Sequence, residues 1–191
     1  MMNTVTGQGS LFLCPSQSDF TLDNVSGLVS ALQEAGFISH PLHTTQENNA
    51  FFSGDHYLDY IAYLGCSPSI QFDISSINSD TNSNFCHVKI HLYDTEKLIV
   101  SQQQARAPHC PKCSKPVKNW QDNLTGEQIL CDQCNSLSAI KDYNWRKMAG
   151  YGRLFIEITD IFPKEAIPQQ LLLEKLKNIS KTDWVYFYSC Q

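Results

Sequence analysis

Four cysteines in the second half of the chain have the spacing of metal ligands. They form two C-x-x-C pairs, Cys110 with Cys113 and Cys131 with Cys134, and seventeen residues separate the pairs. Each C-x-x-C turn is tight enough to aim two sulfur atoms at one point, and the residues between the pairs are sufficient for a hairpin that returns the second pair to the first. Four thiolates complete a tetrahedron around a zinc ion and leave no position for water. The spacing therefore predicts a structural metal site and not a catalytic one.

Three other uses of these cysteines compete with zinc. Two disulfides need an oxidising compartment, and residues 1–10 lack the basic region and apolar run of a secretory signal. A redox dithiol of the thioredoxin type has a single C-x-x-C beside a βαβ unit, whereas this chain has two pairs in a polar stretch. Iron suits a tetrahedral cage of four sulfur atoms as well, so it remains the alternative metal. We favour zinc because the spacing follows the rule for zinc sites.

Residues 107–137 resemble a zinc ribbon, a small module built on two such cysteine turns, or knuckles. The sequences C-P-K-C and C-D-Q-C match its knuckles, and the rest of the chain does not share the resemblance. Many zinc ribbons carry glycine directly after the second cysteine of a knuckle, where this chain has Ser114 and Asn135. Asparagine tolerates the left-handed backbone, so Asn135 fits this role, whereas Ser114 departs from the pattern. The resemblance implies a structural zinc ion in a module that elsewhere contacts nucleic acid, docks on proteins or braces a fold.

The surroundings of the cysteines indicate which side chains the module presents to solvent. Four cysteines already satisfy the metal, so we expect His109, which precedes the first of them, to be exposed and not a ligand. We expect the loop between the pairs to have no core of its own and to be held in shape by the metal. Its exposed residues would be Lys112, Lys115, Lys118 and Trp120, an aromatic residue among cations that suits docking on another protein.

The composition is that of a folded protein of ordinary size. The chain has 191 residues, of which 42% are hydrophobic and 17% charged, enough for one packed domain that carries a small insert. No run of about twenty apolar residues is present, so no membrane span is expected. A cytoplasmic location would keep the thiols reduced, and the other four cysteines are then small core residues. These are Cys14, Cys66, Cys86 and Cys190.

The charge distribution argues against nucleic acid as the main partner. The formal net charge is −5. Residues 106–147 hold seven Lys or Arg and four Asp or Glu, a charge of +3, whereas the remainder of the chain carries −8. A zinc ion with four thiolates adds about −2 and leaves the module near +1. A mildly basic module on an acidic body is a weak electrostatic footprint for nucleic acid.

The rest of the sequence predicts an α+β body at residues 1–104 and 139–191, interrupted by the ribbon at residues 105–138. Apolar runs and period-two alternation predict the strands, and three- and four-residue spacing of apolar residues predicts the helices. Strands are expected at residues 11–14, 57–64, 85–93, 153–159 and 184–188, and helices at residues 22–35 and 168–179. A turn at residues 94–97 would join the third strand to a hairpin partner at 98–101. This order resembles a ferredoxin-like sandwich, an antiparallel sheet with two main helices on one face.

Turn-forming residues mark the ends of both helices. Asp19 or Thr21 is placed to cap the first helix, and Gly36 is placed to end it. Pro168 would lie in the first turn of the second helix, where its missing N–H costs nothing. The Ser-, Asn- and Asp-rich residues 75–84 predict an exposed loop.

No catalytic residue is assigned from the sequence. His87 and His91 are four residues apart, which on a strand is roughly 13 Å, too far for one metal ion, so we expect both on a solvated face. Asp55, His56 and Asp59 form a polar cluster without a nucleophile. No phosphate-binding or metallopeptidase motif is present, and no nucleophile-elbow pattern surrounds Cys66 and Ser67.

Three functions from different classes follow from these observations. The first is a non-catalytic zinc protein that binds another protein through its ribbon. The second is nucleic-acid contact through the same ribbon, which the net charge disfavours. The third is an enzyme whose site lies in the acidic body around Asp55, His56 and Asp59.

Overall fold

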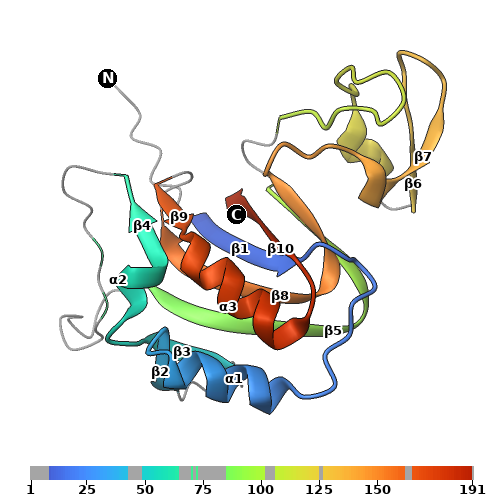
Figure 1. The fold of residues 1–191 in the computed structure, drawn as a ribbon. Coiled ribbons are helices and arrows are strands. Elements are labelled where there is room, and N and C mark those ends of the chain that lie inside the picture. The colour runs from blue at the N-terminus through green and yellow to red at the C-terminus, as the bar shows by residue number, and fades with distance from the viewer. Residues whose placement is uncertain are drawn as a thin grey trace, which may run out of the picture.

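A six-stranded antiparallel sheet forms the body of the protein. The structure is a computed structural model, and it describes residues 9–42, 49–64, 70, 72, 85–101, 106–124, 127–161 and 165–190. The strands of the sheet are β1 (Gly9–Pro15), β2 (Ile38–Pro41), β3 (Ala50–Ser53), β5 (His87–Val100), β8 (Ala149–Ile161) and β10 (Trp184–Cys190). Their order is β10-β1-β8-β5-β3-β2, and every neighbouring pair is antiparallel (Figure 1).

Two short strand pairs and three α-helices complete the described structure. The strand pairs are β4 (Ile61–Tyr63) with β9 (Ala166–Pro168), and β6 (Gln128–Leu130) with β7 (Leu137–Ala139). The helices are α1 (Val25–Glu34), α2 (Tyr57–Tyr60) and α3 (Gln170–Ser180), with 3-10 turns η2 (Trp120–Asn123) and η3 (Ile140–Asp142). Among the described residues no helix is long and apolar enough to cross a membrane. The chain is an α+β protein.

The main core lies between the sheet and the helices α1 and α3. Successive side chains of a strand point to opposite faces, and the odd-numbered residues of β1 share one face with the even-numbered residues of β5 and β8. Both long helices cover that face (Figure 1). The buried side chains that join them are Leu11, Leu13, Leu28, Leu32, Val88, Ile90, Ile156, Ile158, Leu172 and Leu176. This single cluster holds the helices on the same side of the sheet.

The opposite face of the sheet is partly buried, because the sheet curls over it. Phe12, Phe155 and Phe187 are at most 3% exposed on this face, and the rings of Phe12 and Phe187 stack with centroids 5.1 Å apart. The pairing of β5 with β8 shifts register between Leu92 and Lys97, an irregularity that increases strand bending. We call β5 and β8 together the β5–β8 hairpin. The segment at its far end, just before β8, reaches back to β10, where the amide of residue 188 donates to the carbonyl oxygen of residue 147 at 3.0 Å.

Most of the predicted elements are confirmed, with shifted ends. The first strand, the last two strands and both long helices are present. Helix α1 begins at Val25, and its cap is Asn24, whose side chain accepts from the Gly27 amide at 2.8 Å, so the predicted caps further upstream were wrong. Gly36 follows the helix with φ +68°, the left-handed conformation that ends it as expected.

The expected strand at residues 57–64 is wrong in its first half. Residues Tyr57–Tyr60 form the single-turn helix α2, and only Ile61–Tyr63 are extended as β4. Tyr57 and Tyr60 are both buried while Leu58 and Asp59 between them are exposed. This spacing of three suits one turn of helix better than a strand, on which burial would alternate.

The expected turn at residues 94–97 is also wrong. The chain continues through it as one strand, β5, which pairs with β8 on both sides of residues 93–96, where the register shifts. Asp94, Thr95 and Lys97 are exposed, so their polarity reflects solvent contact and not a reversal of direction.

Pro168 does not open the second helix. It is the last residue of the short strand β9, paired with Ile61, and α3 begins two residues later at Gln170. The expected loop at residues 75–84, with Cys66 and Ser67, lies outside the described residues.

Close contact between the curled hairpin and β10 gives a stability prediction. A Cβ atom at Gly150 would lie 2.1 Å from Cε1 of Phe187. We expect Gly150→Ala to lower the free energy of unfolding by about 1–3 kcal/mol through overpacking. Urea denaturation measures it. Adding Phe187→Leu should give a double variant less destabilised than the sum of the two single changes.

Gly152→Ala is the matched control, since the nearest atoms to its added Cβ lie at 3.7 Å or more. It should change stability by no more than about 0.5 kcal/mol. Equal effects of the two glycine substitutions would contradict the closed arrangement of the hairpin on β10.

Candidate metal centre

The four cysteines of the two C-x-x-C pairs meet at one point. Their sulfur atoms all lie within 4.8 Å of one another, with Cys110 Sγ 3.8 Å from Cys134 Sγ and Cys113 Sγ 3.7 Å from Cys131 Sγ. Sulfur atoms at the corners of a tetrahedron with metal–sulfur bonds of about 2.3 Å are separated by about 3.8 Å. A disulfide bond is far shorter, and the seven cysteines among the described residues are all free thiols. The tetrad therefore has the size of a cage for one metal ion.

The first knuckle is a tight turn closed by two backbone hydrogen bonds. The Ser114 amide donates to the Cys110 carbonyl oxygen, and the Cys110 amide donates to that of Lys115, both at 2.9 Å. Ser114 has φ 58°, so the left-handed conformation that many zinc ribbons reach with glycine is adopted here by serine. The Lys112 amide points at Cys110 Sγ, at 3.3 Å, a contact that favours the thiolate.

The second knuckle repeats the first. The Asn135 amide donates to the Cys131 carbonyl oxygen and the Cys131 amide donates to that of Ser136, again at 2.9 Å. Asn135 has φ 55°, the conformation expected for it from the sequence. Two turns of identical hydrogen bonding thus approach the same point from opposite sides and fix the positions of all four sulfur atoms.

Ionisation of the tetrad depends on its close packing. The Ser136 hydroxyl, 3.4 Å from Cys110 Sγ and 3.1 Å from Cys134 Sγ, lowers the pKa of Cys110 to about 6 and also lowers that of Cys134. The Lys115 amide favours the Cys113 thiolate, but burial and the three neighbouring sulfur atoms outweigh it and raise the pKa of Cys113 to about 11. Four thiolates this close repel one another, so full ionisation requires a cation among them.

The residues around the tetrad have a hydrophobic core of their own, contrary to the expectation of a coreless loop. We call this set the ribbon cluster, and it consists of Cys110, Val117, Trp120, Ile129, Cys131, Ile140, Tyr143 and Trp145. Trp120 is 5% exposed and packs edge-to-face on Trp145 with ring centroids 5.3 Å apart. The expectation that Trp120 is exposed for docking was therefore wrong. The sequence around Trp120 does not reveal this burial, because partners such as Trp145 follow the second cysteine pair in the chain.

Polar groups inside the ribbon cluster have hydrogen-bond partners. The Tyr143 hydroxyl donates to the Ile129 carbonyl oxygen at 2.7 Å, and Trp145 Nε1 donates to that of Ile140 at 3.0 Å. The cluster also packs on half-buried residues of β5 and β8, namely Leu98, Val100, Ala149 and Tyr151. The cysteine module, residues 106–124 and 127–145, thus continues the end of the β5–β8 hairpin, as Figure 1 shows. The metal site is anchored on the sheet by apolar contact as well as by the chain.

His109 lies at the base of the module. Its backbone exchanges hydrogen bonds with Asn144, at 2.9 and 3.1 Å, and this bridge closes the module. The residue is half-buried and not fully exposed as expected, and it is not part of the tetrad.

The second candidate cluster from the sequence forms a surface ion pair. His56 Nδ1 lies 3.0 Å from Asp59 Oδ2, with the two side chains 66% and 65% exposed, and Asp55 is exposed beside them. Solvent screens such a pair, and the described residues provide no nucleophile in contact with it. The pair therefore resembles an ordinary surface contact more than an active site.

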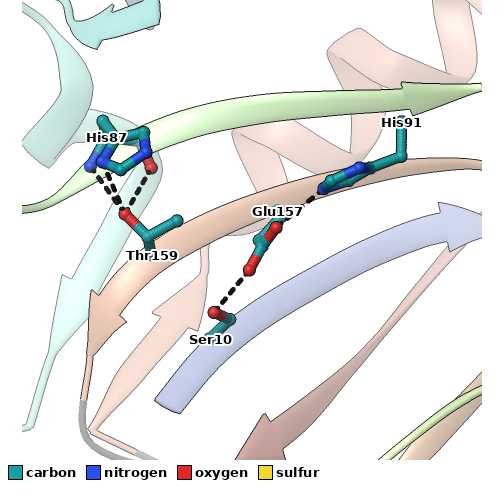
Figure 2. A network of polar contacts seen from close by, with 5 residues as sticks. All are labelled: Ser10, His87, His91, Glu157 and Thr159. Atoms are coloured by element: carbon teal, nitrogen blue, oxygen red, sulfur yellow. Dashed lines mark hydrogen bonds and ion pairs between the residues drawn. The ribbon is translucent and has the colours of Figure 1, made fainter. Parts of the chain in front are cut away.

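His87 and His91 lie apart on β5, each with its own partner, as Figure 2 shows. His91 Nε2 is 2.7 Å from Oε2 of Glu157, and the Ser10 hydroxyl donates to Oε1 of the same carboxylate at 2.6 Å. His87 Nδ1 is 2.9 Å from Oγ1 of Thr159. The solvated face expected for these histidines is in fact half-buried, because the sheet curls over it.

Glu157 is the polar residue that sequence reasoning missed. It is 8% exposed and lies in an apolar strand between Ile156 and Ile158. Burial raises its pKa, but the hydrogen bonds from His91 and Ser10 outweigh burial and hold the pKa below its ordinary value. A carboxylate flanked by apolar residues on both sides, at 154–156 and 158, was the available signal. Its partners come from β1 and β5, so only the sheet order reveals them.

The tetrad gives a direct prediction about metal content. Cys134→Ser removes one of four ligands, so we expect its metal affinity to fall by more than the roughly 10–100-fold that loss of a neighbouring hydrogen bond costs. Elemental analysis of purified protein and competition with a chelator measure this.

Cys190→Ser is the control, because Cys190 is buried in β10 outside the tetrad. That variant should keep the metal content of the wild type. A wild-type protein purified without metal, or equal metal content in both variants, would contradict the cage.

Buried Glu157 gives a prediction about acid stability. Its lowered pKa means that the folded state favours the carboxylate, so its contribution is present above the ordinary pKa of 4.5 and is lost as pH falls through the lower folded value. We expect Glu157→Gln to cost about 1.5–3 kcal/mol at neutral pH and progressively less below pH 4.5. Chemical denaturation across pH tests this. Exposed Glu174→Gln should have almost no effect, and a cost that increased towards acid pH would refute the assignment.

The cysteine tetrad is the one group of three or more potential metal ligands that converge within the described ranges. Comparison of the chain with protein-family models, with curated proteins and with solved structures finds no match. The function therefore has to follow from the geometry of the tetrad and of the surface around it.

Proposed function

We propose that this is a non-catalytic zinc protein, in which a zinc ribbon with a structural four-cysteine site docks on another protein. The observation that carries the proposal is a pair of exposed leucines on the strands that flank the second knuckle. The metal shapes this surface and takes no part in a reaction.

A structural role for the metal follows from its ligand set. Four thiolates fill the coordination sphere of a tetrahedral zinc ion, and no ligand position remains for water or substrate. The Ser136 hydroxyl and the Lys112 amide supply the outer hydrogen bonds that such sites use to orient and stabilise thiolates. Zinc is favoured over iron by the spacing of the pairs, and elemental analysis separates the two metals.

The proposed docking surface has an apolar centre. Leu130 of β6 and Leu137 of β7 face each other across the strand pair, and they are 53% and 59% exposed. They stand directly before and after the knuckle of residues 131–136, so the metal fixes their separation. Leucines exposed in pairs on a rigid hairpin are costly in water and suit the core of an interface.

Exposed cations on and after the first knuckle of the same module indicate the partner's charge. Lys112, Lys115 and Lys118 are all exposed, as the sequence predicted. The Lys118 amide donates to Asp132 Oδ1 at 3.3 Å, which holds the segment after the first knuckle against the second. An acidic segment that carries apolar side chains would match the leucines and the lysines together.

Burial of Trp120 weakens the alternative of nucleic-acid contact. Single-stranded nucleic acid is held by basic grooves with aromatic rings on which bases stack, and Trp120, the aromatic residue that follows the three lysines in sequence, is inside the ribbon cluster. The acidic body disfavours a duplex partner as well.

A fold for the body, and a boundary between the body and the ribbon, are part of the proposal. The order β10-β1-β8-β5, with α1 between β1 and β5 in sequence and α3 between β8 and β10, is the order of a ferredoxin-like sheet. We propose that the body has this fold, with β2 and β3 added at one edge and the ribbon inserted between β5 and β8. The ribbon was expected at residues 105–138, and Ile140, Tyr143 and Trp145 extend its cluster to 145. The free thiols support a reducing compartment, the cytoplasm.

The docking surface is tested with a double substitution. Proximity labelling in cells that express the protein identifies its partners, and purified partner is then titrated against the wild type and Leu130→Glu/Leu137→Glu. We expect the double variant to keep its metal and to bind at least about tenfold more weakly. Lys112→Glu/Lys115→Glu/Lys118→Glu should slow association and reduce its salt dependence.

Leu58→Glu/Leu171→Glu is the matched control, because these leucines are 57% and 53% exposed on the body. It should bind the partner as the wild type does. A partner that binds the ribbon double variant with unchanged affinity would refute the surface. RNA or DNA recovered in its place, with a steep salt dependence, would favour the nucleic-acid alternative.

A further inference from the structure

A cleft of about 780 Å³ opens where the cysteine module meets the body. Its walls come from the loop after β1, the turn that leads from the module into β8, and the start of β10. The volume falls within the range of roughly 300–1,000 Å³ that small-molecule sites occupy. The docking surface around Leu130 and Leu137 lies elsewhere on the module, and neither leucine lines the cleft.

The turn that forms one wall has an unfavourable backbone conformation. Arg146 and Lys147 are consecutive and both left-handed, with φ 53° and 61°, and the Met148 amide closes the turn on the Trp145 carbonyl oxygen at 2.9 Å. Two left-handed residues in succession favour Asn-Gly, since a Cβ atom in this conformation crowds the following carbonyl group. A strained turn that retains two cations where glycine would fit better is a feature of ligand sites.

No described carboxylate pairs with these cations. Within the described part of the chain, no ion pair involves Lys141, Arg146 or Lys147, and all three line the cleft and are exposed. Lys147 Nζ instead contacts the Tyr186 hydroxyl at 2.5 Å and lies 3.8 Å from the centre of its ring. An ammonium bound to one neutral hydroxyl retains donors for an anion.

Aromatic rings and two carboxylates complete the lining. Tyr151 and Tyr186 are half-buried at the cleft, which leaves part of each ring accessible for stacking. Asp19 and Asp142 add two acceptors for hydroxyl groups. The cleft therefore offers cations for phosphate, rings for a flat base, and carboxylates for the hydroxyls of a sugar.

We propose that this cleft binds a nucleotide, with its phosphates on Arg146, Lys147 and Lys141 and its base against Tyr151 or Tyr186. A single nucleotide fits a cleft of about 780 Å³, whereas a polynucleotide would require a basic track beyond the cleft on a body whose net charge is acidic. The cleft is separate from the proposed docking surface, so nucleotide binding and protein docking can each be refuted without affecting the other.

Calorimetric titration of the metal-loaded full chain with ADP, GDP and UDP tests the proposal, with adenosine and pyrophosphate as the separate halves of the ligand. The informative variant is Arg146→Asn/Lys147→Gly, which gives the turn its preferred sequence and removes both cations. It should raise the thermal midpoint by roughly 2–4 °C by relieving strain, and weaken nucleotide binding at least about tenfold. A purely structural role for these residues predicts no loss of binding.

Lys97→Gln/Lys181→Gly is the matched control. Lys97 is exposed on β5, and Lys181 is an exposed left-handed residue with φ 59° at the end of α3, so the pair removes the same charge and relieves one left-handed residue at positions that do not line the cleft. Its nucleotide affinity should equal that of the wild type. Three results would overturn the proposal: no binding at millimolar nucleotide, pyrophosphate binding as tightly as ADP, or a four-nucleotide RNA binding more tightly than any mononucleotide.

Discussion

The convergence of the four cysteine sulfur atoms constrains the cysteine module, which carries the proposed docking surface and one wall of the cleft. Thiolates less than 4 Å apart repel strongly unless a cation lies between them, so the arrangement of the two knuckles and the binding of a metal ion are coupled. The knuckles in turn hold β6 against β7 and seat Trp120 on Trp145. Loss of the ion would free the hairpin that presents Leu130 and Leu137, and it would loosen the wall of the cleft that continues from Tyr143 and Trp145.

A metal ion bound by the tetrad would not stabilise this region alone. The ribbon cluster is continuous with Leu98, Val100 and Tyr151 at the far end of the β5–β8 hairpin, so apolar burial joins the module to the sheet. The curl of that hairpin brings residue 147 to β10 and buries Phe187 beneath Gly150. The position of the strained turn at Arg146 and Lys147 therefore depends on both the sheet and the cysteine module. A site between two such elements is where ligand pockets commonly occur.

Local signals in the sequence were sufficient for the elements that local physics determines. The spacing of the cysteines predicted their convergence, and Gly36 and the periodicity before it predicted the end and the buried face of α1. Features that depend on distant partners were not accessible. Polar residues 94–97 were interpreted as a turn, although a curled strand whose side chains are exposed to solvent accommodates the same residues. Trp120 looked exposed because Trp145, its partner, follows the second knuckle. Glu157 is stabilised by Ser10 and His91, which only the order of β1, β8 and β5 brings to it. At Tyr57 and Tyr60, spacing of three was present in the sequence but too short to be distinguished from a strand.

X-ray absorption spectroscopy at the zinc edge tests the central claim most directly. The purified wild-type protein should contain one zinc ion per chain, coordinated by four sulfur atoms at about 2.3 Å and by no nitrogen or oxygen atom. Iron in place of zinc would alter the identity of the metal but preserve the cage. A light-atom ligand in the coordination sphere would indicate an open, reactive site, and a protein that folds fully without any metal would contradict a structural role for the ion.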